Sequence, residues 1–150
     1  ADEPTTALDV TIQAQILDLI LRLREETGMA VIWISHDLGV VAGLCDRVNV
    51  MYAGRLVEQG PADAVYERAA HGYTRGLLRS VPRIDAGRRR LEPIAGQPPS
   101  LIDLSPLCPF EPRCAFAEAP CRRDPPPARV FGDGHTARCW VDFPPIEEDA

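Results

Sequence analysis

The sequence predicts an α/β fold followed by a small, irregular segment rich in Cys and Pro. Residues 10–27 carry apolar side chains at helical spacing, and residues 29–35 form a continuous apolar run of strand length. A helix followed by a buried strand is typical of α/β proteins. Of the 15 prolines, three lie in residues 1–82 and the other 12 lie in residues 93–150, a density that predicts turns and loops.

The first half is expected to begin with a helix and a strand. Asp9 is a suitable N-cap for a helix that runs to about Thr27, where Gly28 ends it. The apolar face of this helix is formed by Ile12, Ile16, Leu19, Ile20 and Leu23. The run 29–35 predicts a strand buried on both faces of a parallel sheet, because it lacks the alternation of a half-buried strand.

Shorter elements follow. Two strands, 47–52 and 55–59, flank Ala53-Gly54 and predict a hairpin. Pro61 suits the start of a helix, since its missing N–H is not needed there. Helices are expected at residues 37–45, 62–69 and 73–80.

Composition excludes several classes of function. A formal net charge of −6 argues against a surface that binds nucleic acid. No apolar run reaches the roughly 18–20 residues that cross a bilayer. All 16 basic residues are Arg, and a P-loop nucleotide site needs a Lys at the phosphates. The chain also starts with Ala, so we expect a fragment. Because the Lys and the Gly-rich loop are absent, we expect this fragment neither to bind nor to hydrolyse ATP by itself.

Acidic residues and one histidine form the densest group of reactive side chains. Asp2 and Glu3 start the chain, Asp9 follows, and residues 35–37 (SHD) end the predicted buried strand, where ligands of open α/β sheets gather. An Asp that binds Mg²⁺ beside a Glu that accepts a proton from water suits nucleotide hydrolysis. His36 could contact the γ-phosphate. Alternatively, each of these residues is a solvated surface charge or a helix cap.

These residues resemble a known family. Residues 2–9 (DEPTTALD) are similar to the end of the Walker B motif and the D-loop of ABC-transporter ATPase domains. Further similarity covers the switch-histidine loop at 34–37 (ISHD), the following hairpin at 51–60 (MYAGRLVEQG) and the closing peptide at 71–75 (HGYTR). Residues 91–140, with CPFEPRC at 108–114, narrow the resemblance to the ATPase subunits of oligopeptide/dipeptide permeases.

The resemblance has departures and implies a domain organisation. Thr6 stands where Ser is common, Gly72 stands where Pro is common, and the sequence has no Walker A, Q-loop or signature motif. The implied fold is the C-terminal part of an ABC-type P-loop ATPase domain with an irregular Cys-rich segment after it. The corresponding parts are the ATPase part at 1–82, a linker at 83–100, the Cys-rich segment at 101–140 and an acidic tail at 141–150.

The resemblance also implies roles for four residues. Asp2 would hold Mg²⁺, Glu3 would be the catalytic base, Asp9 would reach across an ATP-sandwiched dimer, and His36 would contact the γ-phosphate of ATP. The implied partners are a second ABC ATPase subunit, transmembrane permease subunits and, indirectly, a solute-binding protein. The subunit would lie at the cytoplasmic face of the inner membrane and power the uptake of di- or oligopeptides, with nickel and other solutes left open.

Four cysteines in the Pro-rich segment could share one inorganic centre. Cys108, Cys114, Cys121 and Cys139 are separated by five, six and 17 residues, and none forms the C-x₂-C pair typical of zinc. A reducing compartment disfavours disulfides, and iron–sulfur clusters accept irregular spacing. Members of the resembled subfamily with this pattern hold a [4Fe–4S] cluster, while zinc, disulfides and free thiols remain alternatives. Cys45 is expected to be a small buried apolar residue.

A function of another class stays open. The chain could be an interaction module that a metal or an iron–sulfur cluster holds together, with a vestigial ATPase part. A GxxxxGK[ST] motif and an LSGGQ-like segment upstream of Ala1 would favour the ATPase subunit.

Overall fold

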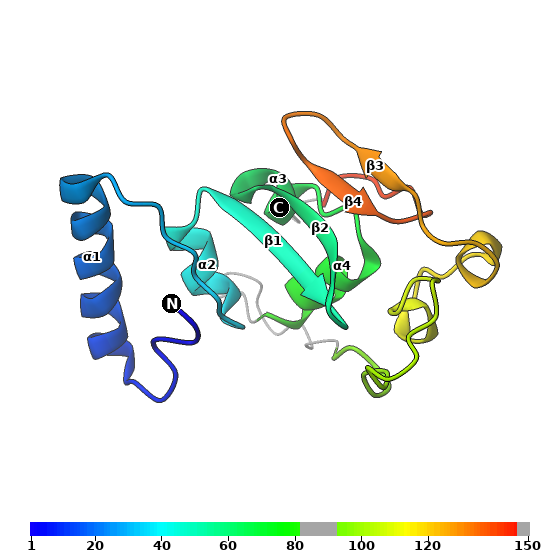
Figure 1. The fold of residues 1–150 in the computed structure, drawn as a ribbon, viewed down its shortest axis with the longest axis horizontal. Coiled ribbons are helices and arrows are strands. Elements are labelled where there is room, and N and C mark those ends of the chain that lie inside the picture. Colours follow the sequence, from blue (N-terminus) through cyan, green and yellow to red (C-terminus); the bar gives the residue numbers. More distant parts are fainter. Residues whose placement is uncertain (82–92, 147–150) are drawn as a thin grey trace. The chain divides into compact units, whose positions relative to one another are not determined.

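The computed structural model describes residues 1–81 and 93–146 (Figure 1). Their contacts divide the chain into two compact units, Ala1–Cys45 and Asp46–Ala150, here called unit 1 and unit 2. Most of the predicted linker (83–92) and the end of the acidic tail (147–150) lie outside the described residues. The Cys-rich segment belongs to the same compact unit as the hairpin.

Unit 1 contains two capped helices, and both predictions are confirmed. Helix α1 (Val10–Thr27) begins where the Asp9 side chain accepts a hydrogen bond from the Ile12 N–H, and it ends at Gly28 in the left-handed conformation (φ 67°). Helix α2 (Leu38–Leu44) begins at Asp37, whose carboxylate accepts the N–H groups of Gly39 and Val40. Local sequence signals therefore define both helices.

The predicted buried strand at 29–35 is wrong for the described residues. Only a parallel bridge between Asp2 and Ile34 forms, with hydrogen bonds from Ile34 N–H to the Ala1 carbonyl and from Glu3 N–H to the Ile34 carbonyl, both 2.9 Å. Ile32 is 80% exposed. Residues 29–35 do not form a buried strand because they lack partners. A strand inside a sheet has a neighbour on each side, and here only residues 1–3 pair with this segment.

The apolar face of α1 also lacks cover from the described residues. None of its side chains is buried, and Ile12, Leu19 and Leu23 are exposed. Helices of this length gain most of their stability from packing such a face. The sequence pattern therefore specifies a packing surface that the described part of unit 1 does not use.

Unit 2 is built on a hairpin that the sequence predicts correctly. Strands β1 (Arg47–Tyr52) and β2 (Arg55–Pro61) pair in antiparallel fashion through a turn at Ala53 (φ 48°) and Gly54 (φ 73°). Two successive left-handed residues match the twist of the flanking strands. In β1 every second residue is buried. Helices α3 (Ala62–Glu67) and α4 (Gly72–Ser80) follow, also as predicted.

The Pro-rich segment is less irregular than the sequence predicts. It holds two short 3-10 helices, η1 (Glu111–Arg113) and η2 (Ala119–Arg122), and two strands, β3 (Ala128–Val130) and β4 (Thr136–Arg138). Strand β4 pairs with β2, which gives one antiparallel sheet of order β1-β2-β4-β3 (Figure 1). Strands of three residues carry almost no periodic signal, so sheet contacts rather than local sequence define them.

Aromatic side chains from three parts of unit 2 form its core beside the hairpin. Tyr52 of β1, Tyr73 of α4 and Phe110 meet with ring centroids 4.6–5.3 Å apart, and the Tyr52–Phe110 pair is edge-to-face. Arg113 adds a hydrogen bond of 3.1 Å to the Tyr52 hydroxyl. This cluster fixes α4 and the Cys-rich segment against the sheet.

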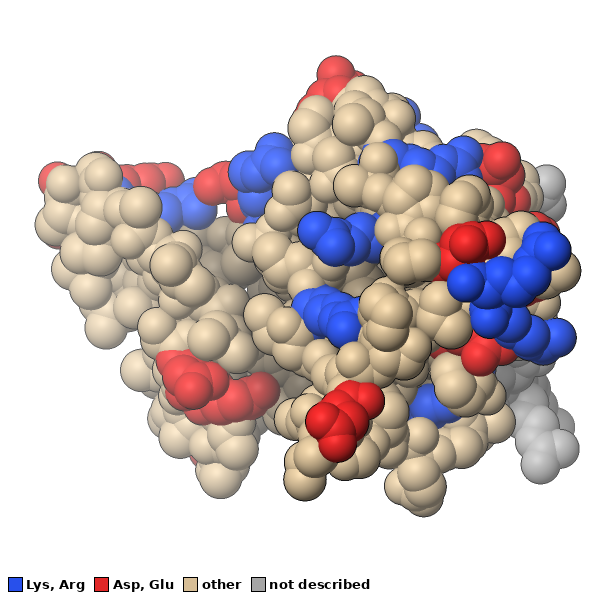
Figure 2. Space-filling view, turned by 45° about the vertical axis from the view of Figure 1, so that its right-hand side comes forward, with Lys and Arg blue, Asp and Glu red and all other residues tan. Residues whose placement is uncertain are grey.

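Charges of both signs are scattered over the face of the molecule in Figure 2. Figure 2 shows basic and acidic side chains next to one another with uncharged surface between the groups. In unit 2, Arg122 pairs with Glu111 at 2.9 Å, and Arg129 pairs with Asp142. None of the helices in the described residues is long and apolar enough to cross a membrane.

Candidate functional site

Glu3 and His36, which the sequence predicts to share a site, are in direct contact. Glu3 Oε1 accepts the backbone N–H of His36 at 3.0 Å and lies 2.9 Å from its Nδ1. The Thr6 hydroxyl donates to the other carboxylate oxygen, Oε2, at 2.7 Å. The bridge between Asp2 and Ile34 brings the two segments together. One carboxylate therefore links the chain start to the loop that contains the histidine.

The contact affects the protonation of both groups. Hydrogen bonds from Thr6 and His36 hold the pKa of the Glu3 carboxyl below its ordinary value. The Glu3 carboxylate in turn raises the pKa of His36. An ionised carboxylate only accepts hydrogen bonds, so Nδ1 of His36 carries a proton in this arrangement.

The backbone at Glu3 is in an unusual conformation. Its φ of 46° lies in the left-handed region, which residues with a side chain seldom occupy. Such residues cost about 1–3 kcal/mol and gather at functional sites. Here the conformation places the Glu3 side chain against His36, while the Glu3 N–H remains bound to the Ile34 carbonyl.

The other predicted residues are close in sequence but not in this contact. Asp9 caps α1, and Asp2 forms the backbone bridge to Ile34. Within the described residues, no hydrogen bond or ion pair joins either side chain to the Glu3–His36 pair. The structure thus joins two of the four predicted nucleotide-site residues directly.

We expect Glu3→Gln to lower the pKa of His36, because the neutral amide no longer stabilises the imidazolium ion. The raised pKa of His36 contributes folding stability at low pH, and this contribution is lost as the pH rises through that pKa. The lowered pKa of Glu3 contributes folding stability at higher pH, and this contribution is lost as the pH falls through that pKa. The pair therefore stabilises the fold between these two values. An NMR titration of His36 in both proteins measures the shift, and an unchanged His36 pKa would contradict the contact.

All four predicted cysteines of the Pro-rich segment gather around one cavity. This cysteine cavity is lined by Cys108, Cys114, Cys121, Cys139, His71 and Phe110, among others. None of the four thiols forms a disulfide. Gly72 is also in the wall, and a Cβ there would lie 2.7 Å from the Cys114 sulfur. This contact gives a physical reason for a glycine at the first residue of α4.

Burial disfavours the ionised form of three of these thiols. Burial raises the pKa of Cys108 and Cys114, and it raises the pKa of Cys139 to about 11. A bound metal centre would supply the positive charge that such thiols need to ionise. In residues 1–81 and 93–146, no group of three or more His, Cys, Asp or Glu side chains is arranged as a metal site. The donors therefore share a cavity without forming a ligand set.

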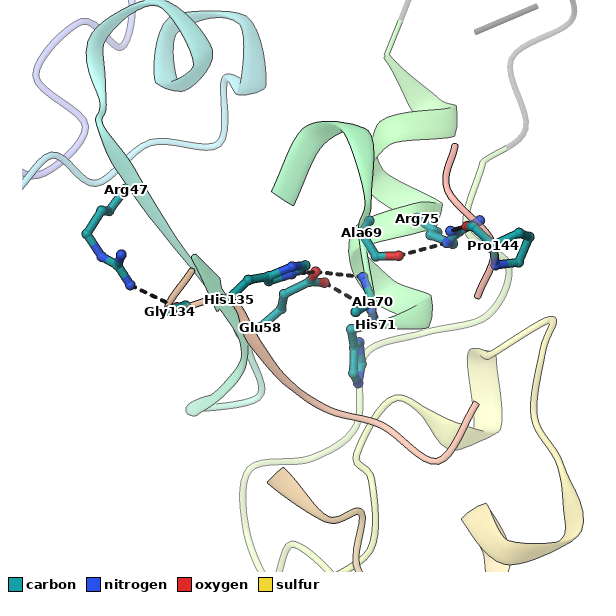
Figure 3. Close-up of polar contacts among 9 residues, drawn as sticks. All are labelled: Arg47, Glu58, Ala69, Ala70, His71, Arg75, Gly134, His135 and Pro144. Atoms are coloured by element: carbon teal, nitrogen blue, oxygen red, sulfur yellow. Dashed lines mark hydrogen bonds and ion pairs between the residues drawn. The ribbon is translucent and has the colours of Figure 1, made fainter. Parts of the chain in front are cut away.

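Sequence reasoning missed a buried polar cluster next to this cavity (Figure 3). The Glu58 carboxylate accepts the backbone N–H groups of Ala70 at 2.6 Å and His71 at 3.0 Å, and it lies 2.8 Å from His135 Nε2. Glu58, His71 and His135 are at most 2% exposed. A Glu in a strand normally indicates an exposed face, so the sequence carries no signal for this burial.

Glu58→Gln should lower the free energy of unfolding by about 1–3 kcal/mol. The amide has one acceptor oxygen instead of two, so a buried N–H of Ala70 or His71 loses its partner. Urea unfolding at neutral pH measures the loss. Glu67→Gln, at an exposed position of α3, is the matched control and should stay within about 0.5 kcal/mol of the parent. Equal stability of both variants would contradict this role for Glu58.

Comparison with known proteins supports the resemblance. Residues 57–121 match the family model described as oligopeptide/dipeptide transporter, C-terminal region. The chain is 49% identical over 141 residues to the oligopeptide transport ATP-binding protein OppD of Haemophilus influenzae, covering 94% of this chain and 43% of that protein. It is 50% identical over 148 residues to OppD of Salmonella typhimurium, covering 99% and 43%.

A dipeptide transport protein is equally similar. The dipeptide transport ATP-binding protein DppD of Bacillus subtilis is 50% identical over 141 residues, which cover 94% of this chain and 42% of that protein. The chain thus spans somewhat less than half the length of these relatives. The resemblance to ATP-binding subunits of peptide transporters is confirmed.

Proposed function

We propose that the chain is part of the ATP-hydrolysing subunit of an ABC importer for di- or oligopeptides, in agreement with the match of residues 57–121 to the family model described as oligopeptide/dipeptide transporter, C-terminal region. The observation that carries the proposal is the contact between Glu3 and His36, 33 residues apart in sequence. A carboxylate can accept a proton from an attacking water and a neighbouring histidine can donate to a phosphate oxygen, so this pair suits the hydrolysis of a phosphoanhydride.

Each predicted residue has a proposed role. Glu3 accepts the proton of the attacking water, a role that needs the ionised carboxylate. His36 gives its Nδ1 hydrogen bond to Glu3, so Nε2 is the ring atom for the γ-phosphate of ATP. Asp9 reaches a second ATPase subunit from the start of α1. Asp2 would hold Mg²⁺, which neutralises phosphate charge; its exposed carboxylate is the donor type that this ion prefers.

The uncovered apolar face of α1 supports the proposed fold, the C-terminal part of an ABC-type P-loop ATPase domain. In a longer domain, further residues would cover this face and the residues 29–35. The partners would be a second ATPase subunit, transmembrane permease subunits and, indirectly, a solute-binding protein, at the cytoplasmic face of the membrane. The alternative of a vestigial interaction module is not favoured, because the similarity to transport ATP-binding proteins includes nearly the whole chain.

Transport by the complete subunit tests the function. Membrane vesicles that contain the subunit and its permease partners should take up a labelled dipeptide only with ATP, and excess unlabelled dipeptide should compete whereas nickel should not. Absence of ATP hydrolysis in these vesicles would overturn the proposal. The sequence before Ala1 offers a simpler check, since it should contain the GxxxxGK[ST] and LSGGQ-like motifs.

We also propose that Cys108, Cys114, Cys121 and Cys139 hold a [4Fe–4S] cluster, with zinc as the alternative. Thiols are the donor type that such a cluster takes, all four line one cavity, and Cys121 and Cys139 are buried. The bound group would supply a covalent connection between η1, η2 and β4. Its role would be structural, holding together a segment with few apolar residues.

A further inference from the structure

Residues 140–146, here called the strap, form one side of the cysteine cavity. Trp140 and Val141 are in the wall of this cavity. Val141 packs with Cys121 and Cys139 in a buried cluster whose members are each at most 8% exposed. The strap therefore limits the access of solvent to these two thiols.

The first half of the strap is attached to its surroundings through several polar contacts. Arg129 of β3 donates to the carbonyl groups of Trp140 at 3.3 Å and Val141 at 3.4 Å, and it pairs with Asp142. The indole N–H of Trp140 donates to the Asp124 carbonyl at 3.1 Å. This half is thus fixed beside the sheet.

The second half of the strap is held mainly by Arg75 of α4. The Arg75 guanidinium donates to the Pro144 carbonyl and, at 2.9 Å, to the Ala69 carbonyl (Figure 3). It also lies 4.5 Å from the centre of the Phe143 ring, in a cation–π contact. The Phe143 ring in turn meets Phe116 edge-to-face at 5.1 Å. One side chain therefore binds both the backbone and the aromatic ring of this half.

Two consecutive prolines make the second half dependent on this side chain. Pro144 and Pro145 have no N–H, so they cannot donate to a neighbouring strand, and the Pro144 carbonyl needs a donor from elsewhere. After them, the Ile146 N–H donates to the Glu67 carbonyl at 2.8 Å. A segment with so few attachments opens at a lower free energy than the sheet beside it.

We propose that the strap is a gate on the cysteine cavity, and that Arg75 holds the second half of the gate closed. Release of Phe143 and Pro144 from Arg75 opens the gate while the sheet stays folded. Opening also separates Phe143 from Phe116 and gives small thiol-reactive solutes access to Cys121. The gate is a property of the polypeptide and does not depend on the cluster proposed above.

Two substitutions open the gate from opposite sides. Arg75→Met removes the donors and the charge and keeps an unbranched apolar side chain. Phe143→Ala removes the ring on the strap and leaves the hydrogen bond between Arg75 and Ala69 in place. Arg68→Met, at an exposed position directly after α3, is the matched control. All three variants are made in the complete subunit.

Hydrogen exchange and hydroxyl-radical footprinting measure opening and access separately. We expect the Ile146 amide to exchange at least about tenfold faster in Arg75→Met and in Phe143→Ala, because a hydrogen bond from a charged donor and an aromatic contact hold the closed state. Oxidation of Cys121 and Phe116 by hydroxyl radicals should rise by a similar factor, since access requires the same opening. In Arg68→Met both rates should equal those of the parent.

Three results would contradict the gate. Exchange of Ile146 at the parental rate in Arg75→Met would show that Arg75 does not hold the strap. Faster exchange of Ile146 without faster oxidation of Cys121 would show that the strap does not close the cavity. If Arg75→Met also speeds exchange in β1, the sheet itself has loosened and Phe143→Ala decides, because parental exchange and oxidation in that variant would overturn the proposal.

Discussion

Glu3→Gln in the complete subunit should leave ATP binding unchanged and reduce ATP hydrolysis at least about 100-fold, because general-base catalysis contributes roughly 10²–10⁴ to a rate. The amide keeps the shape of the carboxylate and can still accept the His36 N–H, which lies 3.0 Å from Oε1 in the parent. It cannot take a proton from water. Binding of a fluorescent ATP analogue and release of phosphate measure the two effects separately.

The control for this experiment is Asp18→Asn on α1. Asp18 pairs with Arg22 on the exposed face of the helix, and such a surface pair contributes little. Its variant should hydrolyse ATP at the parental rate. Turnover by Glu3→Gln near that of the parent would remove Glu3 from the role of base. Loss of ATP binding would instead show that the carboxylate mainly holds the His36 loop in place.

Elements with a local signal could be predicted from the sequence. Asp9 and Gly28 bound α1 because a cap and a left-handed residue act within one turn of the chain. The hairpin follows from Ala53-Gly54 in the same way. The strand predicted at residues 29–35 was wrong because it depends on non-local contacts: an apolar run forms a buried strand only where neighbouring strands pair with it.

The two candidate sites differ in how much the sequence reveals. Glu3 and His36 were expected together from their chemistry and from a family resemblance, and the structure brings them into contact. Glu58 and His71 gave no such signal, because their burial depends on how β2, α4 and β4 pack together. A single Glu in a strand has the same appearance in the sequence whether it faces water or two backbone N–H groups.

The second large effect is expected at the cysteine cavity. The complete subunit, purified without oxygen, should be brown and contain about four iron atoms per chain. Replacing any one of Cys108, Cys114, Cys121 and Cys139 with Ser should remove the colour. It should also increase proteolysis of residues 101–140, because the free energy of binding the cluster is part of the folding free energy of this segment.

Cys45→Ser is the matched control, since Cys45 follows α2 in unit 1 and is not part of the cysteine cavity. This variant should keep its colour and its iron. Colourless parent protein with one zinc per chain would replace iron with zinc and leave the four ligands in place. Parent protein without any metal and with a protease-resistant segment would overturn both assignments, because burial and the aromatic contacts of Phe110 would then suffice to hold the segment on the sheet.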